Sequence, residues 1–257
     1  MRQKLYLSYP RKNCRLLSLH LQYMTQLTTH FLQKFLFGIA RKTASKAIFV
    51  SDFLREKENI VGVNCHTIYN AITAKFISEI PSTQNPTTVL MLCSLKTYKG
   101  VNEFIQLANM LPKQAFELVL NADKKQIEHF FKGIIIPKNL SVFPSQQNVH
   151  PFYNRAKVVL NLSHPDLWVE TFGMTALEAM CYKIPVIVPP VGGIAEVVQH
   201  EKNGYCISVK DLGLIKNQIK NLYTDENLYK KMASASFIRS KDFSIKTLQN
   251  SILKQIK

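Results

Sequence analysis

The stretch from Val158 to Val198 constrains the fold more than any other part of the chain. It opens with a run of branched apolar residues, Val158–Leu162, which is typical of a strand buried on both faces. From Met174 to Tyr182 apolar residues recur every three or four positions, which predicts a helix. A second buried strand, Pro185–Val188, follows. Strand, loop, helix and strand in this order predict a parallel α/β sheet.

Two loops of this stretch are expected at the carboxyl ends of the strands, where ligands of parallel sheets bind. They are Ser163–Gly173 and Pro189–Gly193. The first carries Glu170 to the start of the helix, and Glu178 lies two turns further on. Eight residues are close to a whole number of helical turns, so both carboxylates are expected to face one side.

The start of the same helix predicts an anion site. The backbone amides of Phe172, Gly173 and Met174 lack partners within the helix, and a helix N-terminus attracts negative charge. Carboxylates beside an anion site suit a ligand that carries both hydroxyls and phosphate. A nucleotide-sugar is such a ligand.

The segment Glu170-Thr-Phe-Gly-Met-Thr-Ala-Leu-Glu178 resembles the paired-glutamate motif of retaining glycosyltransferases with the two-domain GT-B architecture. The nearest group is family four, the glycosyl transferases group 1. Gly192-Gly193-Ile-Ala-Glu196 and Asn203-Gly204 resemble the same family. Two glutamates at this spacing are weak evidence alone, and the strand and glycine context makes the motif specific. The resemblance implies an α/β fold of GT-B type, with a complete C-terminal Rossmann-like parallel sheet domain and a partial N-terminal α/β domain.

The loop after the predicted strand Thr88–Cys93 resembles the family's diphosphate-binding loop. The family usually has Gly-Arg-Leu, three residues and Lys-Gly here, and its arginine and lysine bind the donor diphosphate. This chain keeps the leucine, Lys99 and the final glycine, but has Cys93 and Ser94 in place of glycine and arginine. Loss of the arginine removes a bidentate phosphate ligand. We expect Lys96 to replace it as a point charge.

The resemblance also divides the chain into three parts. We expect a partial N-terminal, acceptor-side segment in residues 1–76 and a nucleotide-sugar-binding Rossmann-like domain in residues 77–240. Residues 241–257 are expected to form a helix that crosses back to the first part. The polar stretch Ser78–Thr88 reads as the hinge. A family N-terminal domain is about as large as the second domain, so the chain is either a fragment or has lost half of its acceptor domain.

Hydrophobic periodicity places the remaining elements. The predicted strands are Ala47–Ser51, Cys65–Tyr69, Phe116–Leu120, Leu140–Phe143 and Tyr205–Val209. The predicted helices are Leu16–Ile39, Asp52–Val61, Val101–Leu111, Lys124–Phe131, Val149–Ala156, Leu212–Tyr223, Glu226–Ile238 and Ile245–Ile256. The first of these helices is amphipathic with basic ends, which fits either an anionic membrane surface or packing against a sheet.

The formal net charge of +16 favours acidic partners. These include phosphorylated substrates and an anionic membrane surface, and a merely solvated basic surface is the alternative. No nucleic-acid partner is expected, because no recognisable motif accompanies the charge. The five scattered cysteines, the lack of a signal peptide and the lack of a membrane-spanning stretch predict a cytoplasmic protein, peripheral to the inner face of the membrane if the basic surface binds lipid.

The resemblance to family four implies a retaining hexosyltransferase that uses a nucleotide-diphosphate sugar and a saccharide or lipid-linked acceptor, as in cell-surface polysaccharide synthesis. By the resemblance, Glu170 binds hydroxyls of the transferred sugar, Glu178 binds the ribose, and Lys99 stabilises the diphosphate. Glu170 and Lys99 are the predicted catalytic residues. The predicted donor-binding residues are Ser94, Lys96, Phe172, Gly173, Met174 and Glu178.

No metal and no cofactor are expected, because the architecture generally needs none and no Asp-x-Asp motif is present. Two other functions remain open. One is a non-catalytic, nucleotide-sugar-binding remnant, and the other is a basic membrane-associated adaptor. An epimerase of the same architecture fits less well, because the paired glutamates favour a transferase.

Overall fold

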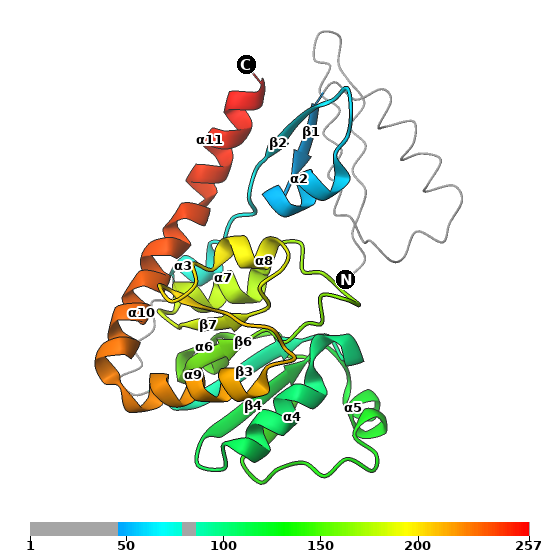
Figure 1. The fold of residues 1–257 in the computed structure, drawn as a ribbon, viewed down its shortest axis with the longest axis vertical. Coiled ribbons are helices and arrows are strands. Elements are labelled where there is room, and N and C mark those ends of the chain that lie inside the picture. Colours follow the sequence, from blue (N-terminus) through cyan, green and yellow to red (C-terminus); the bar gives the residue numbers. More distant parts are fainter. Residues whose placement is uncertain (1–45, 79–85, 257) are drawn as a thin grey trace.

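The computed structural model describes residues 46–78 and 86–256 (Figure 1). The predicted helix Leu16–Ile39 and residues 79–85 of the predicted hinge lie outside these ranges.

A six-stranded parallel sheet forms the larger part of the structure, with the strand order β5-β4-β3-β6-β7-β8 (Figure 1). Its strands are β3 (Thr88–Cys93), β4 (Ala115–Leu120), β5 (Leu140–Phe143), β6 (Ala156–Leu160), β7 (Val186–Val188) and β8 (Gly204–Cys206). The predicted parallel α/β fold is confirmed. The strand order reverses between β3 and β6, so a crevice forms where their carboxyl ends diverge.

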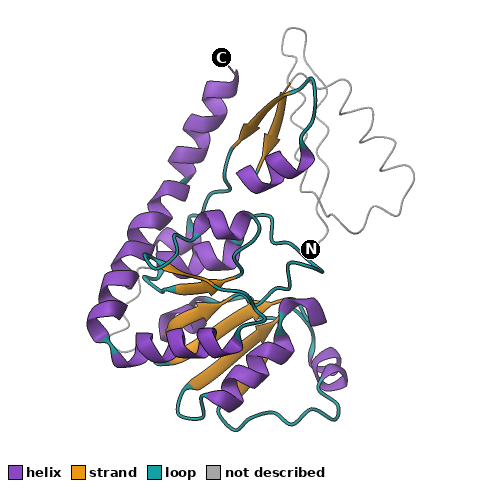
Figure 2. Cartoon of the chain, in the orientation of Figure 1, coloured by secondary structure: helices purple, strands orange, loops and turns teal. Residues whose placement is uncertain are grey.

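Helices cover both faces of this sheet (Figure 2). They are α4 (Val101–Met110), α5 (Lys124–Phe130), α6 (His150–Arg155), α7 (Met174–Cys181), α8 (Gly193–Val197), α9 (Leu212–Thr224) and α10 (Glu226–Ser240). Successive side chains of β3 point to opposite faces. Val89 and Met91 join the core under α4 and α9, whereas Leu90 joins the core under α6 and α7.

A second, two-stranded sheet pairs β1 (Lys46–Phe49) in parallel with β2 (Asn64–Thr67). The crossover helix α2 (Asp52–Glu58) starts at Ser51, whose side chain accepts a hydrogen bond from the Leu54 amide. The prediction that this helix continues to Val61 was wrong. It ends at Asn59, which adopts the left-handed conformation (φ 36°) and stops the helix.

Two short helices and one long helix complete the described chain. Helix α3 (Lys75–Ser78) precedes residues 79–85, and the 3-10 helix η2 (Lys241–Phe243) leads into α11 (Ile245–Ile256). Figure 1 shows α11 running from the large sheet towards the small one. The Lys46 ammonium on β1 donates to the backbone oxygen of Gln255 at 2.5 Å, which joins this helix to the small sheet.

Candidate active site

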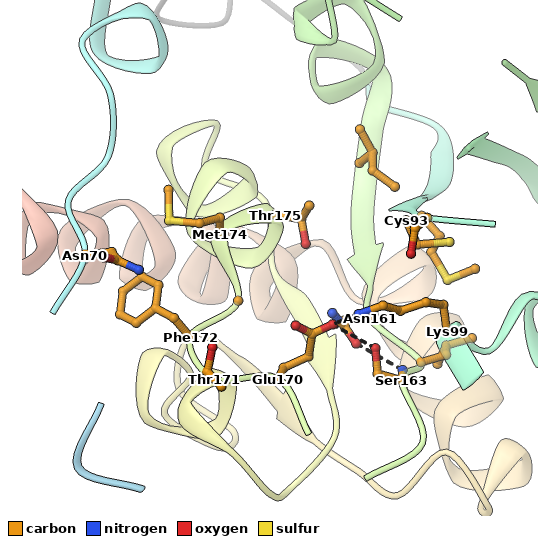
Figure 3. Close-up of a pocket in the computed structure, with 15 residues that line it drawn as sticks. Asn70, Cys93, Lys99, Asn161, Ser163, Glu170, Thr171, Phe172, Met174 and Thr175 are labelled. Carbon is orange, nitrogen blue, oxygen red and sulfur yellow. Dashed lines mark hydrogen bonds and ion pairs between the residues drawn. The ribbon is translucent and has the colours of Figure 1, made fainter. Parts of the chain in front are cut away.

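A pocket of about 310 Å³ opens at the carboxyl ends of β3 and β6 (Figure 3). The loop after β6 and the first turn of α7 form much of its wall, with Glu170, Phe172, Gly173 and Met174 among the lining residues. The segments after β3 contribute Ser94 and Lys99, and Asn70 reaches the pocket from the segment after β2. The structure thus brings together six of the eight predicted site residues.

Lys99 and Glu170 form an ion pair inside this pocket (Figure 3). Lys99 lies at the end of η1 (Thr97–Lys99), a 3-10 helix where the sequence predicted a loop. The Ser163 hydroxyl donates to the same carboxylate oxygen, Oε1 of Glu170, at 3.0 Å. The Lys99 and Glu170 side chains are only 13% and 19% exposed, so water screens their attraction little.

Two aromatic rings lie beside this ion pair. Tyr98 and Trp168 stack with their centroids 5.5 Å apart, and the Lys99 ammonium lies 5.4 Å from the centre of the Trp168 ring. The His164 amide donates to the Tyr98 carbonyl at 2.9 Å and thereby ties the loop after β6 to η1. Sequence analysis missed both aromatic residues, because no local pattern pairs two rings that are 70 positions apart.

The paired glycines explain how the loop that carries Glu170 is held. A Cβ atom at Gly192 would lie 2.5 Å from the Glu170 carbonyl oxygen, and one at Gly193 would lie 2.0 Å from the Thr171 carbonyl oxygen. Helix α8 can approach the loop this closely only because these residues have no side chain. In the sequence the two glycines were recognised only by their resemblance to the family. The structure shows that they allow α8 to pack closely against the loop that carries Glu170.

Glu178 does not line the pocket with Glu170. Its Oε2 accepts a hydrogen bond from the Tyr153 hydroxyl on α6 at 2.8 Å. Burial raises the pKa of its carboxyl group, although the Tyr153 hydroxyl and Lys75 act in the opposite direction. Helical spacing does not relate the two carboxylates, because Glu170 lies four residues before Met174, where α7 begins as the sequence predicted.

Lys96 is also absent from the pocket lining, and its side chain is exposed at the residue before η1. Cys93, which stands where the family has glycine, does line the pocket. Burial raises the pKa of its thiol to about 12, so the thiol is protonated at neutral pH and adds no negative charge.

A second cluster holds the small sheet against the large one. Glu196 on α8 accepts hydrogen bonds from the backbone amides of Asp52 at 2.9 Å and Phe53 at 2.5 Å, at the start of α2. The Tyr69 hydroxyl lies 3.0 Å from both the Asp52 and the Glu196 carboxylates. Hydrogen bonding by Thr67 and Tyr69, together with the charge of Arg55, lowers the pKa of Asp52 despite its partial burial. Glu196 therefore caps α2 across the two sheets.

With this geometry established, the chain can be compared with known proteins. Residues 73–238 match the profile of the family described as glycosyl transferases group 1. The chain belongs to this family. N-acetyl-alpha-D-glucosaminyl L-malate synthase of Bacillus anthracis is 27% identical over 211 residues, which cover 76% of this chain and 54% of that protein. The chain thus spans about half the length of this curated relative.

Solved structures share the fold. The Anabaena protein HepE, crystallised with UDP, superposes with a TM-score of 0.75 at 22% identity, over 88% of this chain and 68% of HepE. Sucrose-phosphate synthase from Thermosynechococcus elongatus gives a TM-score of 0.71 at 17% identity, over 91% of this chain and 64% of that protein. These likenesses establish the GT-B architecture.

Within residues 46–78 and 86–256, no three His, Cys, Asp or Glu side chains gather closely enough to bind a metal ion. In the same ranges, no helix combines the length and hydropathy needed to cross a lipid bilayer.

Proposed function

We propose that this chain is the donor-binding part of a retaining hexosyltransferase that uses a nucleotide-diphosphate sugar. The observation that carries this proposal is the pocket at the β3–β6 crevice, where Lys99 and Glu170 meet the start of α7. A cation and free helix amides suit the diphosphate, and a carboxylate suits sugar hydroxyls. HepE was also crystallised with UDP-glucose, so UDP-sugars are the first donors to test.

In the proposed mechanism, Glu170 orients the transferred hexose by accepting hydrogen bonds from its hydroxyls. Lys99 and the amides at the start of α7 stabilise the negative charge that grows on the departing diphosphate. The acceptor attacks from the face that the diphosphate leaves, and a phosphate oxygen takes the proton of its hydroxyl. This route needs neither a protein nucleophile nor a metal ion.

The proposed division of the chain follows the site. Residues 77–240 would bind the donor, residues 1–76 would supply part of the acceptor side, and residues 241–257 would brace the two. The proposed acceptor is a saccharide or lipid-linked saccharide, as in cell-surface polysaccharide synthesis. The proposed location is the cytoplasm or the inner face of the membrane, where the basic charge would attract anionic lipid. Glu178, by the family resemblance, would contact the ribose.

The test is calorimetric titration with UDP-, GDP- and ADP-sugars, followed by a transfer assay with the sugar that binds. Glu170→Ala should lower the rate of transfer on the order of tenfold or more, because it removes the charged hydrogen-bond acceptor that orients the hexose. Glu178→Ala tests the proposed ribose contact in the same way. If both variants bind and transfer as the wild type does, the assigned site is wrong.

The same experiment separates a second candidate, a nucleotide-sugar-binding remnant without transferase activity. The observation that favours it is Ser94, which lines the pocket where the family usually has an arginine that binds the donor diphosphate. Donor binding without transfer to any acceptor would support the remnant. Salt-sensitive binding to anionic vesicles without affinity for nucleotide-sugars would instead support the membrane adaptor.

A further inference from the structure

We propose that the Lys99–Glu170 ion pair makes the pocket favour the intact donor over the nucleoside diphosphate that remains after transfer. This inference rests on the proposed function and adds a means of releasing the product. The Lys99 ammonium is bound to the Glu170 carboxylate, so each group competes with the part of a ligand that would bind its partner.

The geometry shows a pocket that neutralises itself. Lys99 is the one cationic side chain among the described residues that line the pocket, and its ammonium is bound to Oε1 of Glu170. The hydroxyl of Ser163, which is 1% exposed, donates to that same oxygen and fixes the carboxylate in place. A phosphate that binds Lys99 therefore competes with Glu170 for the charge of the ammonium.

That exchange has a cost that depends on the ligand. Once Lys99 moves to a phosphate, Glu170 keeps the hydrogen bond from Ser163 but loses its cation, and its side chain is only 19% exposed. An intact donor replaces the cation with hydroxyls of its hexose, which hydrogen-bond to the carboxylate. A nucleoside diphosphate has no hexose, so the separated carboxylate stays uncompensated. The apparent affinity for the diphosphate equals the intrinsic affinity multiplied by the fraction of molecules in which Lys99 is not bound to Glu170.

The two aromatic rings support this exchange. The Lys99 ammonium lies 5.8 Å from the centre of the Tyr98 ring and 5.4 Å from that of Trp168, within the range of cation–π attraction. These contacts do not depend on Glu170. They therefore hold the ammonium at the pocket whether it is bound to Glu170 or to a phosphate. Lys99 can thus change partners without leaving the site.

Inorganic pyrophosphate is the direct probe, because it has the diphosphate but neither base nor sugar. In Glu170→Gln the side-chain oxygen still accepts from Ser163, while the negative charge that holds Lys99 is gone. Calorimetric titration at low salt should show pyrophosphate binding to this variant on the order of tenfold more tightly than to the wild type, the size of one charge-assisted hydrogen bond. Glu103→Gln is the matched control, since that glutamate pairs with His164 at 3.0 Å and not with Lys99.

The control should change pyrophosphate affinity by less than about twofold, because it alters only the general potential near the pocket. Lys99→Met combined with Glu170→Gln should abolish the gain, which shows that the freed ammonium produces it. Unchanged or weaker binding to Glu170→Gln, or an equal gain in Glu103→Gln, would overturn the proposal. A gain in Glu170→Gln while the wild type binds no nucleotide-sugar would support the ion-pair exchange and reject the transferase function.

Discussion

The loop Ser163–Gly173 and helix α7 each carry one glutamate of the paired motif, and they place these residues in opposite surroundings. Glu170 on the loop lines the pocket and is bound by Lys99 and Ser163. Glu178 on the helix is mostly buried against α6, where it accepts from Tyr153 and has a raised pKa. Two residues of the same type therefore differ in their surroundings: the Glu170 carboxylate faces the pocket, whereas the Glu178 carboxylate is confined by packing.

The loop owes its shape to other segments, so its supports should matter most for stability. Gly193→Ala would place a Cβ atom 2.0 Å from the Thr171 carbonyl oxygen and 2.7 Å from the Cβ atom of Ser51. Backbone atoms cannot yield by a rotamer change, so the variant should lose about 3 kcal/mol of unfolding free energy. Chemical denaturation followed by circular dichroism measures the loss.

Gly133→Ala is the control for this first prediction. Gly133 has φ +81° and open space around a built Cβ atom, so alanine there meets only the backbone penalty of about 1 kcal/mol. If Gly193→Ala loses no more stability than Gly133→Ala, close packing does not hold the loop, and the contrast with α7 loses its physical basis.

This contrast also marks what the sequence could predict. Buried strands carry their own pattern, and β3 and β5 begin and end where it predicted, at Thr88–Cys93 and Leu140–Phe143. Helix α2 likewise begins at Asp52, where the sequence predicted it to begin. Helix α2 ended early because the left-handed conformation of Asn59 depends on its surroundings and not on hydrophobic periodicity.

For the site, the sequence predicted which residues take part but not which residues they contact. The motif identified Lys99 and Glu170, but their ion pair joins residues 71 positions apart and needs the fold to form. The contact of Glu178 with Tyr153 spans 25 positions, and that of Glu196 with the start of α2 spans 144. A local motif can identify the residues of a site. The contacts between those residues depend on the order of the strands, which brings distant segments together.

The second prediction tests the helix side of the comparison. Tyr153→Phe keeps the ring, which stacks on Tyr182 with centroids 5.3 Å apart, but removes the hydroxyl that donates to Glu178. A hydrogen bond to a buried carboxylate is worth about 1.5–3 kcal/mol, so unfolding free energy at neutral pH should fall by about 2 kcal/mol. Thermal and urea unfolding measure this change.

Tyr223→Phe provides the matched control, because its hydroxyl donates to the neutral carbonyl of Thr87 at 2.6 Å. It should cost about 1 kcal/mol or less, as expected for a bond between uncharged groups. Equal losses of unfolding free energy in the two variants would mean that the hydrogen bond from Tyr153 to Glu178 stabilises the fold no more than a bond between uncharged groups. The environment of Glu178 would then differ less from that of Glu170.

The smallest expected effect is a pH-dependent gain. Because burial raises the pKa of Glu178 above the ordinary value of 4.5, the folded state binds this proton more tightly than the unfolded state. Wild-type stability should therefore fall as pH rises from about 4.5 through the raised pKa. Glu178→Gln removes this contribution while its amide oxygen can still accept from Tyr153.

The variant should accordingly be more stable than the wild type at neutral pH, by a few tenths of a kcal/mol to about 1 kcal/mol. Its advantage should shrink as pH falls through the raised pKa and should be lost by about pH 4.5, and other titrating groups cancel in the difference between the two proteins. Urea unfolding across this range, repeated in the Tyr153→Phe background, measures both the slope and the coupling. The neutral-pH gain should be larger without the tyrosine, because the hydroxyl stabilises the charged carboxylate. A constant difference at all pH values would show that Glu178 titrates alike in the folded and unfolded states, which would remove the distinction between the helix and the loop.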